Sequence, residues 1–169
     1  MTCGPWHTHP GFIEAIAATV QQASQVLGPA RAQRAALIYT AHAIPQTMAT
    51  GAPYTQQFAT TAAAAAQRLG RQDYRLAYQS QATGTPFPWL QPDINDAIVQ
   101  VQAEGYRDVI VAPIGFLCDH VEVLYDLDIQ ARDTALACGL TYVRAATVGT
   151  HTAFLTMLSE LLAERLRSG

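Results

Sequence analysis

The sequence has little charge and few cysteines, and each shortage excludes a class of protein. Charged residues make up 14% of the 169 residues, and the formal net charge is −3. Its ten basic residues are spread along the chain, without the basic patch or stripe of a nucleic-acid-binding domain, so no nucleic-acid partner is expected. Cys3, Cys118 and Cys138 form no Cys-x-x-Cys pair, which argues against a disulfide framework and a structural zinc site.

Long apolar runs are missing as well. No run approaches the roughly 18 residues that suggest a membrane-spanning helix, so no transmembrane segment is expected. The first ten residues, MTCGPWHTHP, have neither the basic start nor the apolar stretch of a signal peptide. Together with the unpaired cysteines, these absences predict a protein of the reducing cytoplasm.

The sequence does contain short and long hydrophobic patterns that alternate. Half of its residues are hydrophobic, enough to build one core in a chain of this length. Short runs rich in Val, Ile, Tyr and Ala are typical of parallel strands covered on both faces, and they lie at 35–41, 74–80, 108–114 and 141–148. Helical patterns lie at about 10–27, 54–69, 92–105, 120–138 and 151–167.

Glycines and a carboxylate mark the ends of these predicted helices. Gly70, Gly105 and Gly139 each follow a helical pattern, as glycines commonly do. Asp119 stands where it can cap the helix that begins near residue 120. We therefore predict one Rossmann-like, three-layer α/β domain over residues 1–169, with a four-stranded parallel sheet and right-handed crossovers that place helices on both faces.

Polar residues follow three of the predicted strands. Ligands of an open parallel sheet bind beyond the carboxyl ends of its strands. His42 follows the first strand and Ser80 the second, Trp89 lies in the loop after Ser80, and His120 and Glu122 follow the third strand. Each alone has an ordinary explanation, such as a loop histidine or a carboxylate that favours a helix N-terminus. Their convergence on one rim favours a functional site.

The residue types at this rim suit a divalent metal. Imidazole and carboxylate without thiolate suit iron, zinc or cobalt. Glu122 and Asp126 are four residues apart and are expected to project from one side of a helix, but the next position in that spacing is Gln130. Two histidines and two carboxylates around an open cleft indicate a site that transfers a metal, since a structural site would be closed.

The other three histidines are expected to be structural. His7 and His9 have the spacing of a metal pair, but they precede the first helix and are expected to share no face with the rim. His151 stands at the start of the last helix.

At these residues the sequence resembles the C-terminal half of ferrochelatase, the enzyme that inserts ferrous iron into a porphyrin to make haem. AHAIP at 41–45 resembles the family's His-Ser-Leu-Pro motif, and GAPY at 51–54 resembles its Gly-Asp-Pro-Tyr motif. The region 78–92, YQSQ…PFPWLQP, is similar to its Gln-Ser…Pro-Trp-Leu region. PIGFLCDHVEVLYDLDI at 113–129 resembles its most characteristic segment, and WHTHPGFIEA at 6–15 extends the resemblance over nearly the whole chain.

The resemblance implies a role for each matching position. His42 and Glu122 fall on the family's catalytic histidine and glutamate, which accept protons and ligate the metal, and His120 falls on a further catalytic histidine of the cleft. Asp126 would join His42 and Glu122 as a metal ligand on the approach path. The loop that flanks the macrocycle would supply the substrate-binding residues Gln79, Ser80, Pro88 and Trp89. The implied metal is Fe²⁺ as a substrate, with Zn²⁺ as a surrogate.

Several departures from the family keep other functions open. Ala43 and Ala52 replace a Ser and an Asp of the motifs, and Gln130 replaces the last acidic residue of the metal path. The cysteine-rich tail that carries an iron–sulfur cluster in some members is absent, so neither that cluster nor another tightly bound cofactor is expected. The family's N-terminal lobe, the other wall of the porphyrin cleft, is also missing from this sequence.

Three functions are consistent with this pattern. The first is a ferrochelatase-type lyase whose cleft is completed by the missing lobe or by a second copy of the chain. The second is a non-catalytic metal- or tetrapyrrole-binding half-domain. The third is a half-size homodimeric chelatase for another metal or tetrapyrrole, such as cobalt. The choice between coproporphyrin and protoporphyrin, and the activity of the isolated half, stay open.

Overall fold

A four-stranded parallel sheet forms the centre of the protein in a computed structural model that describes residues 4–82 and 84–167. Cys3 lies outside the described residues. The strands are β1 (Ala36–His42), β2 (Arg75–Gln79), β3 (Asp108–Ala112) and β4 (Thr141–Arg144), and their order across the sheet is β2-β1-β3-β4. The predicted α/β class and parallel sheet are confirmed.

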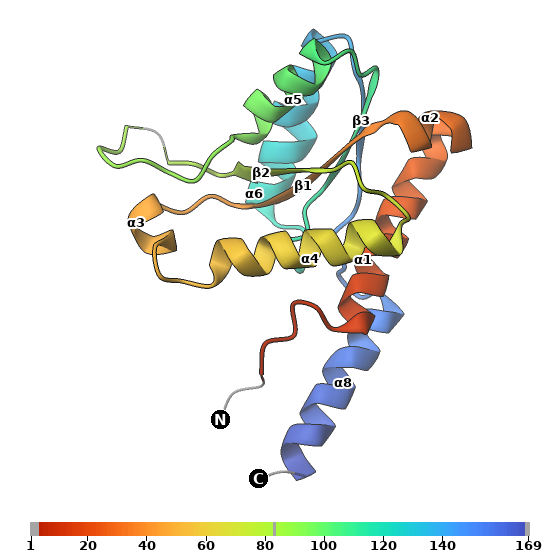
Figure 1. Ribbon diagram of the computed structural model, residues 1–169, viewed down its shortest axis with the longest axis vertical. Coiled ribbons are helices and arrows are strands. Elements are labelled where there is room, and N and C mark those ends of the chain that lie inside the picture. Colours follow the sequence, from red (N-terminus) through yellow and green to blue (C-terminus); the bar gives the residue numbers. More distant parts are fainter. Residues whose placement is uncertain (1–3, 83, 168–169) are drawn as a thin grey trace.

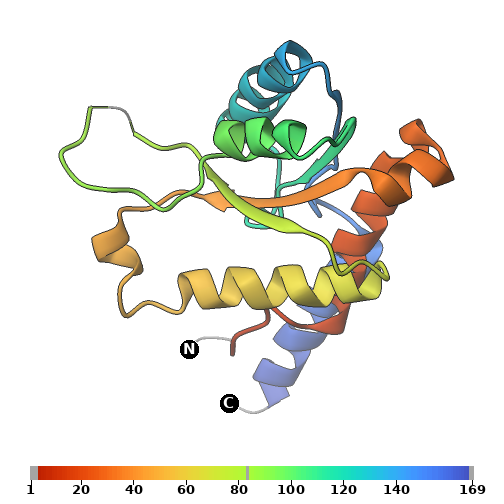
Figure 2. The same cartoon turned by 45° about the horizontal axis from the view of Figure 1, so that its top comes forward.

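Two groups of helices cover the two faces of the sheet (Figures 1 and 2). One face carries α1 (Pro10–Ser24), α4 (Tyr54–Arg68) and α8 (Thr152–Arg167). The other carries α5 (Ile94–Ala103), α6 (Val121–Tyr125), the π-helix η2 (Asp126–Ala131) and α7 (Arg132–Ala137). Three short helices flank β1 in the sequence. The helices η1 (Gln25–Leu27) and α2 (Pro29–Arg34) precede it, and α3 (Gln46–Ala49) follows it.

Alternate residues of β1 belong to two separate cores. Leu37, Tyr39 and Ala41 pack with α1, α4 and α8, whereas Ala36 and Ile38 pack with α5, α6 and α7. Successive side chains of a strand point to opposite faces, so a strand buried on both sides is largely apolar. Thr40 of β1 is polar and buried, and its hydroxyl donates a hydrogen bond to Gln79. The burial of both faces explains why the central strands were readable from the sequence.

Several predicted helix ends are confirmed. Gly70, Gly105 and Gly139 follow α4, α5 and α7 with φ angles of 68°, 91° and 72°. His9 caps α1, since its Nδ1 accepts a hydrogen bond from Gly11 N at 3.1 Å. The Nδ1 of His151 accepts from Ala153 N at 3.2 Å at the start of α8.

The predicted helix over 120–138 is interrupted, and its cap differs from the prediction. The structure divides it into α6, η2 and α7. His120 occupies the N-cap position, and no side-chain cap hydrogen bond is formed there. The prediction that Asp119 caps this helix is wrong, because its carboxylate instead binds the guanidinium of Arg144, with Nη1 and Oδ1 3.1 Å apart. A charged donor is a stronger partner than a backbone N–H.

No helix within the described residues is both long enough and apolar enough to cross a membrane. The longest of them, α8, has 16 residues.

The loop after β3 approaches β1 closely at Gly115. A Cβ built there would lie 2.6 Å from the Cα and Cβ of Ala41, and Gly115 N donates to Thr40 O at 3.0 Å. We therefore expect Gly115→Ala to lower the free energy of unfolding by about 1–3 kcal/mol through overpacking. Urea unfolding measures this change. Gly4→Ala, whose Cβ meets nothing within 4 Å, is the matched control. Equal midpoints for the two variants would contradict the close approach.

Candidate functional site

The carboxyl ends of β1 and β3 bring His42 and Glu122 together. His42 is the last residue of β1, and Glu122 lies in the first turn of α6, which follows the loop after β3. His42 Nε2 is 3.7 Å from Glu122 Oε2, and the two side chains are 37% and 53% exposed. The predicted meeting of these residues at one rim is confirmed, and the pair is open to solvent.

The backbone contacts of His42 determine which ring nitrogen is free to react. Its Nδ1 contacts the carbonyl oxygen of Ala43. A carbonyl only accepts hydrogen bonds, so Nδ1 carries the hydrogen and the lone pair of the neutral ring lies on Nε2. Nε2, which faces Glu122, therefore has a lone pair that can accept a proton or bind a metal.

Tyr54 supports the backbone of His42 from α4. Its hydroxyl donates to His42 O at 2.7 Å. Burial, reinforced by the neighbouring Tyr78, raises the pKa of Tyr54 to about 12, so the phenol stays protonated at neutral pH. Tyr54 therefore remains a donor and holds the end of β1 in place.

The ring of Phe116 lies beside both histidines of the rim. Its ring centroid lies 6.3 Å from that of His42 and 5.4 Å from that of His120. Phe116 itself is buried. The side chain of His120 has no hydrogen-bond partner among the described residues, so its ring nitrogens are available to a ligand.

Asp126 is tied to the end of β2. The hydroxyl of Ser80 donates to Asp126 Oδ2, and Gln79 Nε2 lies 3.5 Å from the same oxygen. Gln79 is 1% exposed, and its Oε1 accepts from Thr40 Oγ1 at 2.9 Å. Ser80 has a φ of 63°, a strained backbone conformation for a residue other than glycine. Gln79 therefore exposes almost no surface, and its amide lies beside the carboxylate of Asp126.

The spacing of the acidic residues changes at Asp126. Asp126 N donates to Glu122 O, so these two residues are separated by one α-helical turn, as predicted. Asp126 also begins η2, whose π-helical hydrogen bonds join residues five apart. The four-residue spacing that the sequence extends to Gln130 is therefore broken. Short π-helical segments occur frequently at functional sites.

Pro88 and Trp89 lie in the loop between β2 and α5, which folds back along the segment after β1. Gln46 N donates to Pro88 O at 2.9 Å, and Trp89 pairs with Pro45 in an isolated antiparallel bridge. Trp89 Nε1 donates to Thr85 Oγ1 at 2.7 Å. The predicted macrocycle loop thus stands beside the end of β1, with Trp89 only partly buried.

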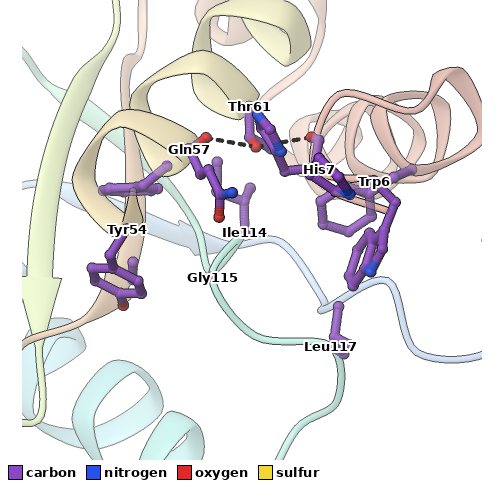
Figure 3. Close-up of a pocket in the computed structure, with 12 residues that line it drawn as sticks. Trp6, His7, Tyr54, Gln57, Thr61, Ile114, Gly115 and Leu117 are labelled. Atoms are coloured by element: carbon purple, nitrogen blue, oxygen red, sulfur yellow. Dashed lines mark hydrogen bonds between the residues drawn. The ribbon is translucent and has the colours of Figure 1, made fainter. Parts of the chain in front are cut away.

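An apolar pocket of about 380 Å³ adjoins the end of β1 on its α4 side (Figure 3). Figure 3 shows Trp6 and His7 facing Tyr54 and Gln57 across the loop of Gly115. The complete lining is Pro5, Trp6, His7, Phe12, Ala41, Tyr54, Gln57, Phe58, Thr61, Ile114, Gly115 and Leu117.

The prediction that His7 shares no face with the rim stays a prediction, because none of the rim residues His42, Ser80, Trp89, His120 and Glu122 lines this pocket. His7 lines this pocket together with Ala41 at the end of β1 and with the loop after β3. Thr61 Oγ1 lies 2.9 Å from His7 O, to which it donates, and thereby binds the segment before α1 to α4. The sequence holds one signal for this pocket, since Trp6 and Tyr54 belong to segments that resemble the family, but the motifs alone give neither residue a role.

The donor set at the rim is too small to store a metal. Among the described residues, no group of three or more His, Cys, Asp or Glu side chains could hold an ion. His42 and Glu122 offer two donors at an exposed edge. This arrangement can receive protons and ligate a metal in passing, provided that a second molecule supplies the remaining ligands.

Comparisons with known proteins agree with the pattern of motifs. A family model described as ferrochelatase matches residues 1–166. A ferrochelatase of Rhodopirellula baltica is 40% identical over 159 residues, which cover 94% of this chain and 45% of the relative. A coproporphyrin III ferrochelatase of Nocardia farcinica is 38% identical, covering 94% of this chain and 47% of the relative, and one of a Geobacillus species is 34% identical, covering 98% and 54%. The chain spans about half the length of the curated relatives it matches.

Proposed function

We propose that this chain, which belongs to the ferrochelatase family, provides one half of a site that inserts a divalent metal into a porphyrin for haem biosynthesis. The observation that carries the proposal is the His42–Glu122 pair, 3.7 Å apart at the open rim of the sheet. The proposed metal is Fe²⁺, with Zn²⁺ as a working surrogate. Both ions enter as substrates, and we propose no tightly bound cofactor and no iron–sulfur cluster.

The reaction requires two proton acceptors, and the pair supplies two. A porphyrin loses two pyrrole N–H protons as one divalent cation enters, so charge is conserved. Glu122 supplies a carboxyl group, and His42 Nε2 carries the free lone pair. The contact of Nδ1 with the carbonyl of Ala43 favours the protonated ring as well as the neutral one, because Nδ1 donates in both states. Partial exposure lets both groups release their protons to water.

The porphyrin would lie against apolar surface on both sides of the end of β1. Trp89 stands on one side of the pair, and the pocket of Trp6 and Tyr54 stands on the other. The chain contains two tryptophans. Quenching of their fluorescence by a porphyrin, measured in Trp6→Phe and Trp89→Phe separately, tests which wall is contacted.

The opposite wall of the cleft would come from another polypeptide region. The chain spans about half the length of its curated relatives, so we propose that either a complementary lobe or a second copy of the chain completes the site. We also propose a cytoplasmic location, as the sequence predicts. Relatives named as ferrochelatase and as coproporphyrin III ferrochelatase both occur, so protoporphyrin and coproporphyrin are both tested as substrates.

The decisive experiment measures insertion of Zn²⁺ into each porphyrin by absorbance, alongside the mass of the chain by sedimentation. Insertion by the chain alone as a dimer supports a half-size chelatase, and Co²⁺ in place of Zn²⁺ tests the cobalt alternative. Insertion only after a complementary lobe is added supports a divided ferrochelatase. Tight porphyrin binding without insertion in either case would favour the non-catalytic binding half-domain, which the two-donor metal site also allows.

Asp126→Asn should raise the KM for Zn²⁺ severalfold and leave kcat at saturating metal nearly unchanged. The amide keeps the size of the carboxylate and can still contact Ser80 and Gln79, but it removes a charge that attracts the cation. Initial rates at varied Zn²⁺ measure the change. Asp133→Asn is the matched control, because Asp133 is an exposed carboxylate that pairs with Arg132 outside the rim. An equal rise in KM for the two variants would contradict a role for Asp126 in metal approach.

A further inference from the structure

Arg144 makes five hydrogen-bond contacts from a nearly buried position. It is the last residue of the edge strand β4, and its side chain is 15% exposed. Its Nε and Nη2 donate to the two oxygens of Asp128 at 2.5 and 3.0 Å. Its Nη1 and Nη2 donate to the two oxygens of Asp119 at 3.1 and 3.4 Å, and Nη1 also donates to Ala145 O at 3.3 Å. These contacts match the five N–H donors of a guanidinium.

The two carboxylates bound by Arg144 lie at either end of the segment 119–128, which carries the candidate site residues that follow β3. Asp119 directly precedes His120, and Asp128 lies in η2, two residues after Asp126. Between them lie His120, Glu122 and Asp126. One guanidinium therefore holds the entry to α6 and the π-helical turn at a single point on β4.

The start of the segment lacks local support. The helix α6 begins after His120 without a side-chain cap hydrogen bond. It continues as a π-helix, which is rare and seldom longer than one turn. On its other side, Asp126 is tied to β2 through Ser80. The segment is thus fastened to both edge strands of the sheet, at β2 and at β4.

We propose that Arg144 is a positioning residue for the proposed metal insertion. By binding Asp119 and Asp128, Arg144 sets the placement of Glu122 opposite His42. Arg144 does not contact His42 or Glu122 and takes no proton. Its effect reaches the reaction through the backbone of residues 119–128. The expected effect of Arg144 on metal insertion rests on the proposed function. The clamp, meaning the contacts of Arg144 with Asp119 and Asp128, is a separate structural claim.

Arg144→Met removes the charge and all five donors at similar length. We expect kcat for Zn²⁺ insertion to fall on the order of 10-fold, as for other residues that orient a reacting group. The KM for porphyrin should not change. Arg144→Lys, which keeps the charge but loses the planar fork, should restore part of kcat. A merely structural residue would lower the midpoint of unfolding and leave kcat per folded chain unchanged.

Hydrogen exchange provides a readout that does not depend on activity. In Arg144→Met, amides of residues 120–131 should exchange faster, while amides of β1 and β3 keep their protection. Arg132→Met removes the exposed Arg132–Asp133 pair just beyond this segment and is the matched control. If Arg144→Met does not fold, Asp128→Asn weakens the same clamp from its more exposed side and replaces it in both assays.

The results separate the clamp from the proposed function. Faster exchange in 120–131 together with the kcat loss supports the proposal. Unchanged exchange and unchanged kcat in Arg144→Met overturn it, even where the native chain is active. Faster exchange in a chain that shows no insertion with or without a complementary lobe supports the clamp and refutes the proposed function.

Discussion

Replacing Glu122 by Gln should lower the rate of metal insertion by on the order of 10²-fold or more, the range expected for a lost general base. The amide keeps the shape of the side chain and its ability to hydrogen-bond, but it has no negative charge and accepts no proton. The carboxylate lies 3.7 Å from His42 Nε2, where the second proton acceptor stands. Porphyrin affinity should change little, because the contact surface is preserved.

Zn²⁺ insertion followed by absorbance measures this loss, and porphyrin titration measures the unchanged affinity. Glu14→Gln is the matched control, since Glu14 is an exposed glutamate that pairs with Arg68 on the far side of the sheet. A carboxylate that only favours the N-terminus of α6 would give a different result. Its loss would cost about 0.3–1 kcal/mol of stability and leave insertion intact. That outcome would remove Glu122 from the proposed mechanism.

The strands and the rim were predictable because they depend on simple periodicities. Ala36 to Ala41 are all buried and, apart from Thr40, hydrophobic, so β1 could be recognised as an apolar run. Parallel strands end at the same edge, so His42 and Glu122 could be placed together from their positions after β1 and β3 alone. Their distance then confirmed a relation between segments that lie far apart in the chain.

The details that tertiary contacts decide were not predictable. Asp119 fits a capping position, but Arg144 reaches it from β4, and no local pattern indicates that competition. The π-helix after Tyr125 was not predictable either, because the apolar spacing over 120–138 indicates one continuous helix. His7 lines a pocket only because the segment before α1 folds over the loop of Gly115. At Asp119 and at His7 the contact that decides the outcome comes from a residue distant in the sequence.

His42→Ala should reduce metal insertion by on the order of 10²- to 10⁴-fold, because it removes a proton acceptor and a metal ligand at once. The substitution leaves the backbone carbonyl of His42, to which Tyr54 donates at 2.7 Å, and so keeps the end of β1 in place. It also leaves an open space beside Glu122 at a solvent-exposed rim. Added imidazole should therefore restore part of the rate.

The restored rate distinguishes chemistry from folding. Rescue should increase with pH through the range where free imidazole loses its proton, because only the neutral ring has the lone pair that accepts a proton or binds a metal. His151→Ala, which removes a histidine that caps α8, should lower stability without changing insertion, and imidazole should have no effect on it.

In the double variant of His42→Ala and Glu122→Gln, the loss of insertion rate should be smaller than the product of the two single losses, since the effects of residues that act as a unit are not additive. Fully multiplicative losses would mean that the two residues act independently, and the shared proton-accepting role proposed for them would be refuted.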